Sequence, residues 1–497
     1  MTPLPAPVYA AAAVRAADRH ATEVLGIPGA ELMARAGEAA FSLLRRQWPL
    51  ARRLLVLAGP GNNGGDAYVV ARLARAAGIG VVLVAPAGAA ADGDAARARS
   101  DWADGGGVET PWSAALVREA EVVVDGLLGT GLGRDVGEPY AALIAMVNGA
   151  DRPVVALDLP SGLDADTGRV RGIAVRAALT VTFVGLKSGL FLGDGPDHVG
   201  RLEWDGLGVP ASAFGDAQPR LRRITADDVR RLLPRRPRTA HKGSNGRVLV
   251  IGGGPGMPGA ARLAGEAALR AGAGLVTVAT SPAHAAMIAA GRPELICLPT
   301  EDAASLHAAL EAADVVAVGP GLGRSAWARG LVEVAFASGR PLVVDADALN
   351  LLAERPRCGP AWCLTPHPGE AGRLLGTSAT AVQADRLASA HALVERYGGV
   401  IVLKGAGTLV AASGAPPQVC DRGNPGMAVA GMGDVLTGVI AAIAAQQADP
   451  RAALASAAAV GVAVHAAAGD LAARAGERGL VASDVLASLP SCVNPAP

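Results

Sequence analysis

The chain has 497 residues, more than the roughly 250–300 at which a single hydrophobic core stops growing, so we expect two domains. Hydrophobic residues make up 51% and charged residues 18%, which excludes a largely disordered chain. Basic and acidic residues number 45 each. Because the net charge is zero, no global field draws the protein to nucleic acid or to an anionic membrane, and we expect neither as a partner.

Cysteine usage and the absence of targeting signals indicate a cytoplasmic protein. The five cysteines are odd in number and form no C-x-x-C pair, which suits a reducing compartment. The first twenty residues lack a basic start followed by a sustained apolar run. No stretch of about 20 apolar residues is free of charges and turn signals, so we expect no membrane span.

Lysine is rare in this chain, since only Lys187, Lys242 and Lys404 occur beside 42 arginines. A strong preference for arginine would keep lysine mainly where a compact, flexible ammonium is needed and a planar guanidinium does not fit. Chance is the rival explanation. The sequence around each lysine therefore has to decide between a functional role and chance.

Apolar runs rich in Val, Leu and Ile alternate with alanine-rich helical segments along the whole length, a pattern typical of parallel β-α-β units. Two such series occur, separated by a stretch with several prolines and an arginine cluster at residues 208–243, and we place the linker near residues 211–224. We therefore predict an α/β protein with two domains, residues 1–212 and 224–497.

In the first series, polar and glycine-rich runs follow three strands: GPGNNGGD at 59–66, DGLLGTGLGRD at 125–135 and DLPSGLD at 158–164. The carboxyl ends of parallel strands meet at one edge of a sheet, where ligands bind. The glycines are expected to permit left-handed turns and to present N–H groups to an anion. The Asn, Asp and Ser oxygens could hold one hard cation or a ribose, and the lack of clustered cysteines argues against a redox metal.

Together these runs, preceded by AADRHATEVLGIPGAELMARAG, resemble the NAD(P)H-hydrate epimerase domain over about residues 10–212. The resemblance implies a Rossmann-like three-layer sandwich. It implies Asp158 as the acid/base or substrate-binding carboxylate, and a potassium ion held by Asn63, Asp125 and Ser161. The residues that would embrace the hydrated dinucleotide are Asn62, Asn63, Gly64, Gly65, Asp66, Gly129, Thr130, Gly131, Leu132, Gly133, Arg134 and Asp135.

In the second series, the run GNPGMAVAGMGD at 423–434 is the most informative. Its glycines precede Asp434, and an apolar helix then begins. A helix end of this kind can steady the charge of a phosphoryl group, while the carboxylate accepts a hydroxyl proton. A plain N-cap aspartate is the alternative. Lys404, in LKGAGT, follows a predicted strand and could reach phosphate oxygens, so we expect Lys404 and Asp434 to face one phosphate-sized hollow.

The second series also contains the runs DVVAVGPGLGR, VVDADALN and CLTPHPGE, in which His367 lies on a rigid loop between prolines. Read together, these runs resemble the ADP/ATP-dependent NAD(P)H-hydrate dehydratase domain, a ribokinase-like fold, over about residues 224–495. The resemblance implies Asp434 as the base and Ala260, Gly321 or Gly323, and His367 as contacts of the hydrated dinucleotide. The adenine nucleotide would be bound by Lys404, Gly405, Ala406, Gly407, Thr408, Asn424 and Gly433.

The two resemblances imply a complete repair unit. ADP would phosphorylate the hydroxyl at C6 of the hydrated nicotinamide with the help of Mg²⁺, phosphate would then leave, and the epimerase would supply the reactive epimer. NAD(P)HX and ADP are the expected ligands, and we expect a homo-oligomer. Two alternatives remain at this point: a ribokinase-like small-molecule kinase, and a chain whose N-terminal domain is only a nucleotide- or RNA-binding scaffold.

Overall fold

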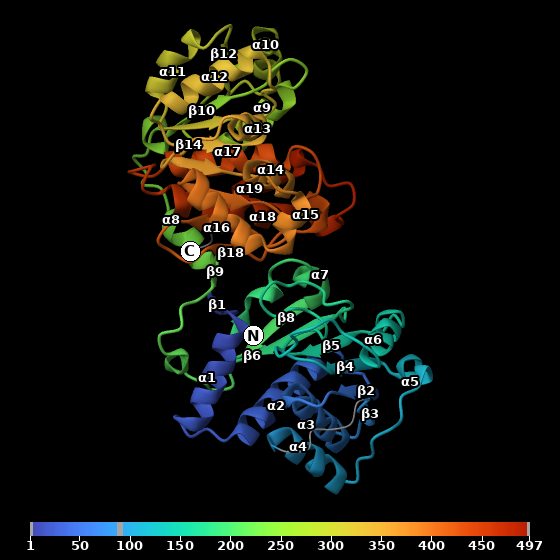
Figure 1. Ribbon diagram of the computed structural model, residues 1–497. Helices are drawn as coiled ribbons and strands as arrows, with labels where there is room; N and C mark the ends of the chain where they lie inside the picture. Colours follow the sequence, from blue (N-terminus) through green and yellow to red (C-terminus); the bar gives the residue numbers. More distant parts are fainter. Residues whose placement is uncertain (1–2, 87–92, 495–497) are drawn as a thin grey trace. The chain divides into compact units, whose positions relative to one another are not determined.

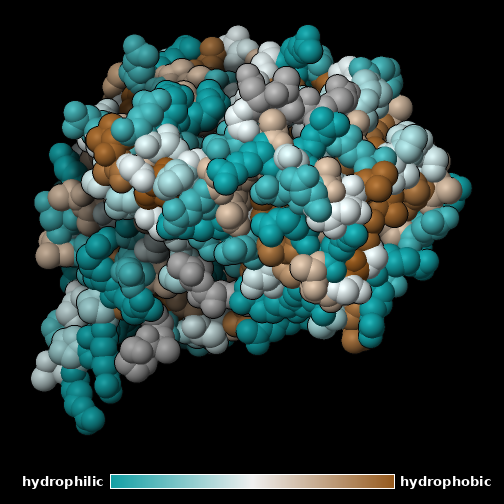
Figure 2. Space-filling view, turned by 90° about the horizontal axis from the view of Figure 1, so that it is seen from below, coloured by the Kyte–Doolittle hydropathy of each residue, from teal (hydrophilic) through white to brown (hydrophobic). Residues whose placement is uncertain are grey.

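The computed structural model describes residues 3–86 and 93–494 and divides the chain into two compact units, Met1–Leu221 and Arg222–Pro497 (Figure 1). Both units are α/β, with helices packed on a mainly parallel sheet. On the face shown in Figure 2, hydrophilic residues predominate and hydrophobic residues form small separate groups.

The first unit is built on a six-stranded parallel sheet with the order β3-β2-β4-β5-β6-β8. Its strands are β1 (Pro7–Tyr9), β2 (Arg53–Ala58), β3 (Gly80–Val84), β4 (Val122–Gly126), β5 (Val154–Leu157), β6 (Leu179–Phe183), β7 (Leu186–Lys187) and β8 (Arg201–Asp205). Its helices are α1 (Ala11–Glu23), α2 (Gly29–Gln47), α3 (Asn62–Ala76), α4 (Gly93–Asp104), α5 (Ala114–Glu119), α6 (Tyr140–Asn148) and α7 (Gly195–Val199), with short 3₁₀ turns η1 (Ser188–Leu190) and η2 (Ala211–Phe214).

Helices cover both faces of this sheet, and strand β2 shows how. Leu54 and Val56 join the core formed with α2 and α3, whereas Leu55 and Leu57 join the core formed with α6. Because successive side chains of a strand point to opposite faces, a strand covered on both sides is apolar at every position. The unit is therefore a three-layer sandwich, as the sequence predicted.

The second unit has a ten-strand arrangement in the order β12-β11-β10-β13-β14-β15-β16-β17-β18-β9, parallel from β12 to β16 and antiparallel at β16-β17 and β17-β18. Its strands are β9 (Leu221–Arg223), β10 (Arg247–Ile251), β11 (Leu275–Thr280), β12 (Ile296–Pro299), β13 (Val315–Val318), β14 (Leu342–Val344), β15 (Trp362–Leu364), β16 (Val400–Leu403), β17 (Thr408–Ala412) and β18 (Gln418–Cys420).

The helices of the second unit alternate with these strands. They are α8 (Ala226–Leu232), α9 (Pro258–Arg270), α10 (Pro282–Gly291), α11 (His307–Ala312), α12 (Ala326–Ala337), α13 (Ala346–Glu354), α14 (Pro368–Leu375), α15 (Ala379–Ala384), α16 (Arg386–Tyr397), α17 (Met432–Ala445), α18 (Leu454–Ala472) and α19 (Ala482–Cys492). The 3₁₀ turns are η3 (Lys242–Asn245), η4 (Ala304–Leu306), η5 (Pro425–Met427) and η6 (Ala473–Ala475).

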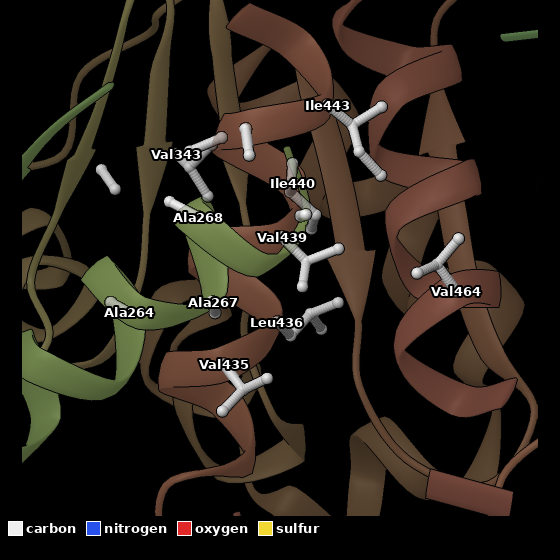
Figure 3. Close-up of a cluster of buried hydrophobic side chains, with 14 of the residues drawn as sticks. Ala264, Ala267, Ala268, Val343, Val435, Leu436, Val439, Ile440, Ile443 and Val464 are labelled. Carbon is white, nitrogen blue, oxygen red and sulfur yellow. The ribbon is translucent and has the colours of Figure 1, made fainter. Parts of the chain in front are cut away.

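Helix α17 is the centre of the second core and lies against α9, α18 and the sheet (Figure 3). Its residues from Val435 to Ala445 are buried on every side, as expected of a helix that is apolar all round. A Cβ at Gly438 would lie 2.0 Å from the carbonyl oxygen of Ala264, so the glycine lets α9 approach closely. This packing fixes the N-terminus of α17, and with it Asp434.

Helix α18 accounts for the apolar stretch that could be mistaken for a membrane span. In the part of the chain that the structure describes, Leu454–Ala475 is the one segment long and apolar enough to cross a membrane. However, 72% of its most apolar window is buried inside the protein. It packs against α17 and α19 as a core helix.

Candidate active sites in the two units

The first unit contains a cavity of about 650 Å³ at the carboxyl ends of β2, β4 and β5, bounded also by α1 and α2. The predicted residues that line it are Asn62, Asn63, Asp66, Gly129, Thr130, Gly131, Leu132, Gly133, Arg134 and Asp158. The structure adds Arg15 and Asp18 to this wall, and it also places there Lys187, whose role the sequence left open. Gly64, Gly65 and Asp135 were predicted to contact the ligand but are not in the wall, and Asp135 is exposed.

The glycines of the 59–66 run do not form the left-handed turns that the sequence predicted. Helix α3 begins at Asn62, and Gly59, Gly61, Gly64 and Gly65 all lack a left-handed φ. A Cβ at Gly59 would lie 1.8 Å from the carbonyl oxygen of Leu127, and one at Gly64 would lie 1.9 Å from that of Gly59. These glycines therefore permit close packing of the strand ends and the helix start, which brings Asn62 and Asn63 to the cavity.

Asp158 lies directly after β5 and is held in the cavity wall by Lys187. The Lys187 ammonium contacts Asp158 Oδ1 and also donates to the Phe183 carbonyl at 2.9 Å and to Thr182 Oγ1 at 3.1 Å. Asp158 Oδ1 further accepts from the Phe183 N–H at 3.1 Å. Since all three ammonium donors are used within the protein, Lys187 positions Asp158.

Asp158 has a left-handed backbone, with a φ of 62°. Val184, in the same cavity wall, has a similar φ of 61°. A left-handed φ is unfavourable for residues other than glycine and tends to occur at functional sites.

Two further carboxyl groups face the same cavity. Burial raises the pKa of Asp18 to about 6, and the Asp158 charge adds to the rise while Lys187 opposes it. Burial also raises the pKa of Asp66 well above its usual value, together with the charges of Asp158 and Asp18. The cavity thus combines one lysine-paired carboxylate with two carboxyl groups whose pKa values are raised, which suits proton transfer.

Asn63, Asp125 and Ser161 meet beneath this cavity. Ser161 donates from Oγ to Asp125 Oδ1 at 2.6 Å and from its N–H to Asp125 Oδ2 at 2.8 Å. Burial raises the pKa of Asp125 to about 6, since its side chain is fully enclosed. Asn63 donates to the Leu128 carbonyl, but its buried Oδ1 has no hydrogen-bond partner. Asn63 and Ser161 both contact the Leu128 carbonyl, so the three side chains are neighbours. An unpartnered buried oxygen in a group that also holds an enclosed carboxyl is an environment that a hard cation fits.

In the second unit, Lys404 follows β16 and pairs with Asp345, which follows β14. The Lys404 ammonium is 2.8 Å from Asp345 Oδ1 and 3.8 Å from Glu370 Oε2. Asp345 also accepts from Thr365 Oγ1 at 2.8 Å and from Thr437 Oγ1 at 2.9 Å. Burial opposes ionisation of Asp345, but Lys404 and these hydroxyls outweigh it and lower its pKa.

Asp434 lies in the first turn of α17, beside this ion pair. A Cβ on its neighbour Gly433 would lie 3.1 Å from Lys404 Nζ and 3.4 Å from Asp345 Oδ2, so the helix end, the ammonium and the carboxylate are in contact. Burial raises the pKa of Asp434 to about 7, with the Asp345 charge adding to it and Lys404 opposing it. Lys404 and Asp434 thus lie at one edge of the sheet.

The predicted nucleotide loop, 404–408, is shaped by glycine and by a buried arginine. Gly405 and Gly407 have φ of 132° and 63°, values that other residues rarely adopt. Arg386, 3% exposed, donates from Nη2 to the carbonyls of Leu403 at 3.1 Å and Lys404 at 3.2 Å and lies 3.4 Å from that of Gly407. The second predicted segment is held by Asn424, which caps η5 and donates to Asp470 Oδ1.

The residues predicted to contact the hydrated dinucleotide lie in two places. A Cβ at Gly321 would lie 2.9 Å from the Ala260 Cβ, so these two residues adjoin, and the Gly323 N–H donates to Asp347 Oδ2 at 2.8 Å. His367 caps α14 and accepts from the Gly369 N–H at 3.0 Å through Nδ1. Burial and the Lys404 charge lower the pKa of His367, leaving Nε2–H on a half-exposed side chain.

The residues of these sites that were missed from the sequence include Arg15, Asp18, Asp345 and Arg386. Asp18 lies on α1, far from any strand end, and Arg386 opens an ordinary amphipathic helix among 42 arginines. The signal for Asp345 was present, because it directly follows the buried run LVV. Lys242 lies at the amino end of β10, at the opposite edge of the sheet from the carboxyl ends.

Comparisons with known proteins agree with this division. A family model of the YjeF-related protein N-terminus matches residues 29–189, and one of NAD(P)H-hydrate dehydratase matches residues 248–491. A bifunctional NAD(P)H-hydrate repair enzyme of Coxiella burnetii is 48% identical over 97% of this chain and 98% of its own length. The enzyme of the same description from Escherichia coli K12 is 46% identical over 99% and 95%. The chain belongs to the family of bifunctional NAD(P)H-hydrate repair enzymes.

The match to this repair family covers nearly the whole length of the chain. It decides against both alternative functions, a small-molecule kinase and an N-terminal nucleotide- or RNA-binding scaffold. Family members combine an epimerase and a dehydratase domain in one chain, as this chain does. The fold of the second unit is shared with a ribokinase-like superfamily protein of Enterococcus faecalis V583, with a TM-score of 0.51, 29% identity, and coverage of 55% of this chain and 95% of that chain. The predicted ribokinase-like fold is thereby confirmed.

Proposed function

We propose that residues 224–497 dehydrate hydrated NAD(P)H with ADP as phosphoryl donor, and that residues 1–212 interconvert its two C6 epimers. The observation that carries the dehydratase assignment is the contact of Lys404, Asp345 and the first turn of α17, where Asp434 lies. Cationic charge and free N–H groups at one helix end favour a phosphoryl group, and a carboxylate with a pKa of about 7 is suited to act as a base near neutral pH.

In the dehydratase step, Asp434 accepts the proton of the C6 hydroxyl as its oxygen attacks the terminal phosphorus of ADP. The P–O bond to AMP breaks, and AMP leaves. The C6–O bond of the phosphorylated intermediate then breaks, phosphate departs, and a proton leaves C5, so the C5=C6 double bond of the dihydronicotinamide forms. Lys404 and the helix end stabilise the phosphoryl charge throughout.

In the epimerase step, the cavity positions C6 of the hydrated ring against its carboxyl groups. Inversion requires a bond at C6 to break and to re-form on the other face, with a proton moved to and from the C6 oxygen. Asp158, oriented by Lys187, is the proposed acid/base. The side chains that orient Asp158 are local, because Thr182, Phe183 and Lys187 all contact the same Asp158 oxygen.

Mg²⁺ fits the second site only as a partner of the nucleotide. Among the described residues, no group of three or more His, Cys, Asp and Glu side chains is arranged to hold a metal ion. Asp434 and Glu370 provide carboxylates near Lys404, and Mg²⁺ is usually held by one or two carboxylates, waters and substrate phosphates. When bound, the ion would neutralise phosphate charge.

K⁺ is proposed to bind Asn63, Asp125 and Ser161, because of the unpartnered Asn63 oxygen and the enclosed Asp125 carboxyl. A bound cation favours the ionised carboxylate, so K⁺ should raise the melting temperature of the protein above pH 6 by a few degrees relative to Na⁺. The effect should fade below pH 6, where Asp125 is protonated. An equal response in Asp125→Asn would contradict this assignment.

The reaction scheme is tested by following recovery of dihydronicotinamide absorbance from mixed hydrate epimers, with and without ADP. We expect full recovery with the unaltered chain, about half with Asp158→Ala and none with Asp434→Ala. A stable phosphorylated hydrate as the end product would contradict the elimination step. A homo-oligomer in the cytoplasm remains our prediction, and light scattering of the purified chain tests the oligomeric part.

A further inference from the structure

A second, smaller cavity lies in the second unit, away from Lys404 and Asp434. It has a volume of about 290 Å³ and opens at the carboxyl ends of β11 and β12 and at the start of α12. Its walls are Pro255, Pro282 and Trp327, with Glu301 and Ser281 as polar groups. This volume is at the small end for ligand pockets, which suits one base and its ribose.

Trp327 forms a rigid aromatic wall. Its indole N–H donates to the Thr300 carbonyl at 3.0 Å, and its ring lies 3.3 Å from the position of a Cβ on Gly254. The ring is therefore fixed on two sides while the side chain stays partly exposed. A fixed, accessible indole flanked by prolines is a platform on which a base can stack.

The cavity lies next to residues predicted to contact the hydrated dinucleotide. Gly254 donates its N–H to the Gly321 carbonyl at 2.7 Å, and Gly321 adjoins Ala260. Pro255, the next residue, lines the second cavity. A dinucleotide whose hydrated ring lies near Asp434 and Gly321 needs a place for its other end along the same strand ends, and this cavity is there.

We propose that the second cavity binds the adenosine end of the hydrated dinucleotide, with the base on Trp327 and the ribose at Glu301. This inference rests on the proposed dehydratase function. Glu301 is exposed, and within the described chain it makes no hydrogen bond or ion pair, so its oxygens are free to accept from a ribose hydroxyl. A carboxylate at the ribose favours a 2′-hydroxyl and repels a 2′-phosphate, so the site selects NADHX over NADPHX.

The test compares KM values of the full chain at saturating ADP for NADHX, NADPHX and hydrated reduced nicotinamide mononucleotide, which lacks the adenosine. Trp327→Ala should raise KM for NADHX about tenfold, as expected for loss of one stacked base, and leave KM for the mononucleotide unchanged. Trp327→Phe should keep most of the affinity. Glu301→Gln should lower the ratio of KM for NADPHX to KM for NADHX about threefold, whereas Glu311→Gln, an exposed carboxylate on α11, should not.

The outcomes separate the two proposals. If neither the unaltered chain nor any variant dehydrates any of the hydrates, the proposed function is wrong. If the unaltered chain is active but Trp327→Ala changes KM equally for the dinucleotide and the mononucleotide, or Glu301→Gln leaves the ratio unchanged, the adenosine site is overturned. Should Trp327→Ala unfold, the KM ratio of Glu301→Gln still decides the proposal.

Discussion

Each unit pairs a rare lysine with an aspartate at its strand ends, but the pair does a different job in each. In the first unit, Lys187 contacts Asp158, which is itself the proposed acid/base. In the second unit, Lys404 pairs with Asp345, and the proposed base, Asp434, lies beside the pair without joining it. The same two side-chain types therefore orient a reactive carboxylate in one unit and build its surroundings in the other.

The carboxyl groups around the two lysines also differ in their electrostatics. Lys404 forms its ion pair with Asp345 and not with Asp434. Burial of Asp434 and the negative charge of Asp345 therefore outweigh the attraction of Lys404 and raise the pKa of Asp434 to about 7. In the first unit, burial raises the pKa values of Asp18 and Asp66, although the Lys187 charge opposes both shifts. A lysine near a catalytic carboxyl thus says little about the role of that carboxyl until the lysine's own hydrogen-bond partner is known.

Asp434→Asn is expected to have the largest effect and tests the second half of this comparison. We expect dehydration to fall about 10³-fold, within the range for loss of a general base, while epimerisation in the same chain stays unchanged. In the unaltered chain the rate should rise with pH through about 7, because Asp434 must lose its proton to act. A flat profile between pH 6 and 8, with phosphorylation measured directly, would contradict a base of this pKa.

The same substitution should stabilise the second unit at high pH. A folded pKa of about 7, above the ordinary value of 3.8, means that ionised Asp434 opposes folding. The melting temperature of Asp434→Asn should therefore exceed that of the unaltered chain at pH 8, and the gap should close as the pH falls towards 4. Stabilisation with loss of activity is typical of active-site residues.

The next largest effect is expected on stability, when each of the two lysines is replaced in turn. Lys404→Met leaves Asp345, whose side chain is 2% exposed, without its cation, and breaking such a buried pair costs about 3–5 kcal/mol. Lys187→Met leaves Asp158, 18% exposed at the cavity, where water can compensate, so we expect a smaller loss of about 1–3 kcal/mol.

Hydrogen exchange of peptides from β14–β16 and β5–β6 measures the two losses separately. The double variant Lys404→Met/Asp345→Asn is the control, since it removes both charges and should recover much of the stability. If Lys187→Met proves the more destabilising of the two single variants, the contrast between the pairs is wrong.

The positions that the sequence predicted well are those set by periodicity and chain direction. Buried apolar runs located β2, β4, β5, β14 and β16, and residues just after a strand, such as Asp158 and Lys404, had to lie at the ligand edge of the sheet. Those positions follow from local patterns, so one sequence suffices to find them.

What could not be predicted depends on contacts between distant segments. The antiparallel strands β17 and β18 are short, and no apolar alternation distinguishes them from loops. The glycines at 59 and 64 have the composition of a phosphate loop, and only the carbonyls packed against them show that they serve close packing. Asp18 reaches its cavity from a helix that carries no ligand signal.

Arg386→Lys should have the smallest effect and tests whether the second site depends on a loop that the first site lacks. Arg386 donates to the carbonyls of Leu403 and Lys404 through Nη2 and to Gln383 Oε1 through Nη1. Lysine keeps the charge but has a single donor nitrogen and cannot make both sets of contacts in the same geometry, so the 404–408 loop should loosen. We expect KM for ADP to rise about fivefold with little change in kcat, because Asp434 lies on α17, outside the loop. Arg396→Lys, an exposed arginine at the end of the same helix, should leave both constants unchanged. If kcat falls while KM for ADP stays constant, Arg386 acts on the reacting groups and the loop is not its target.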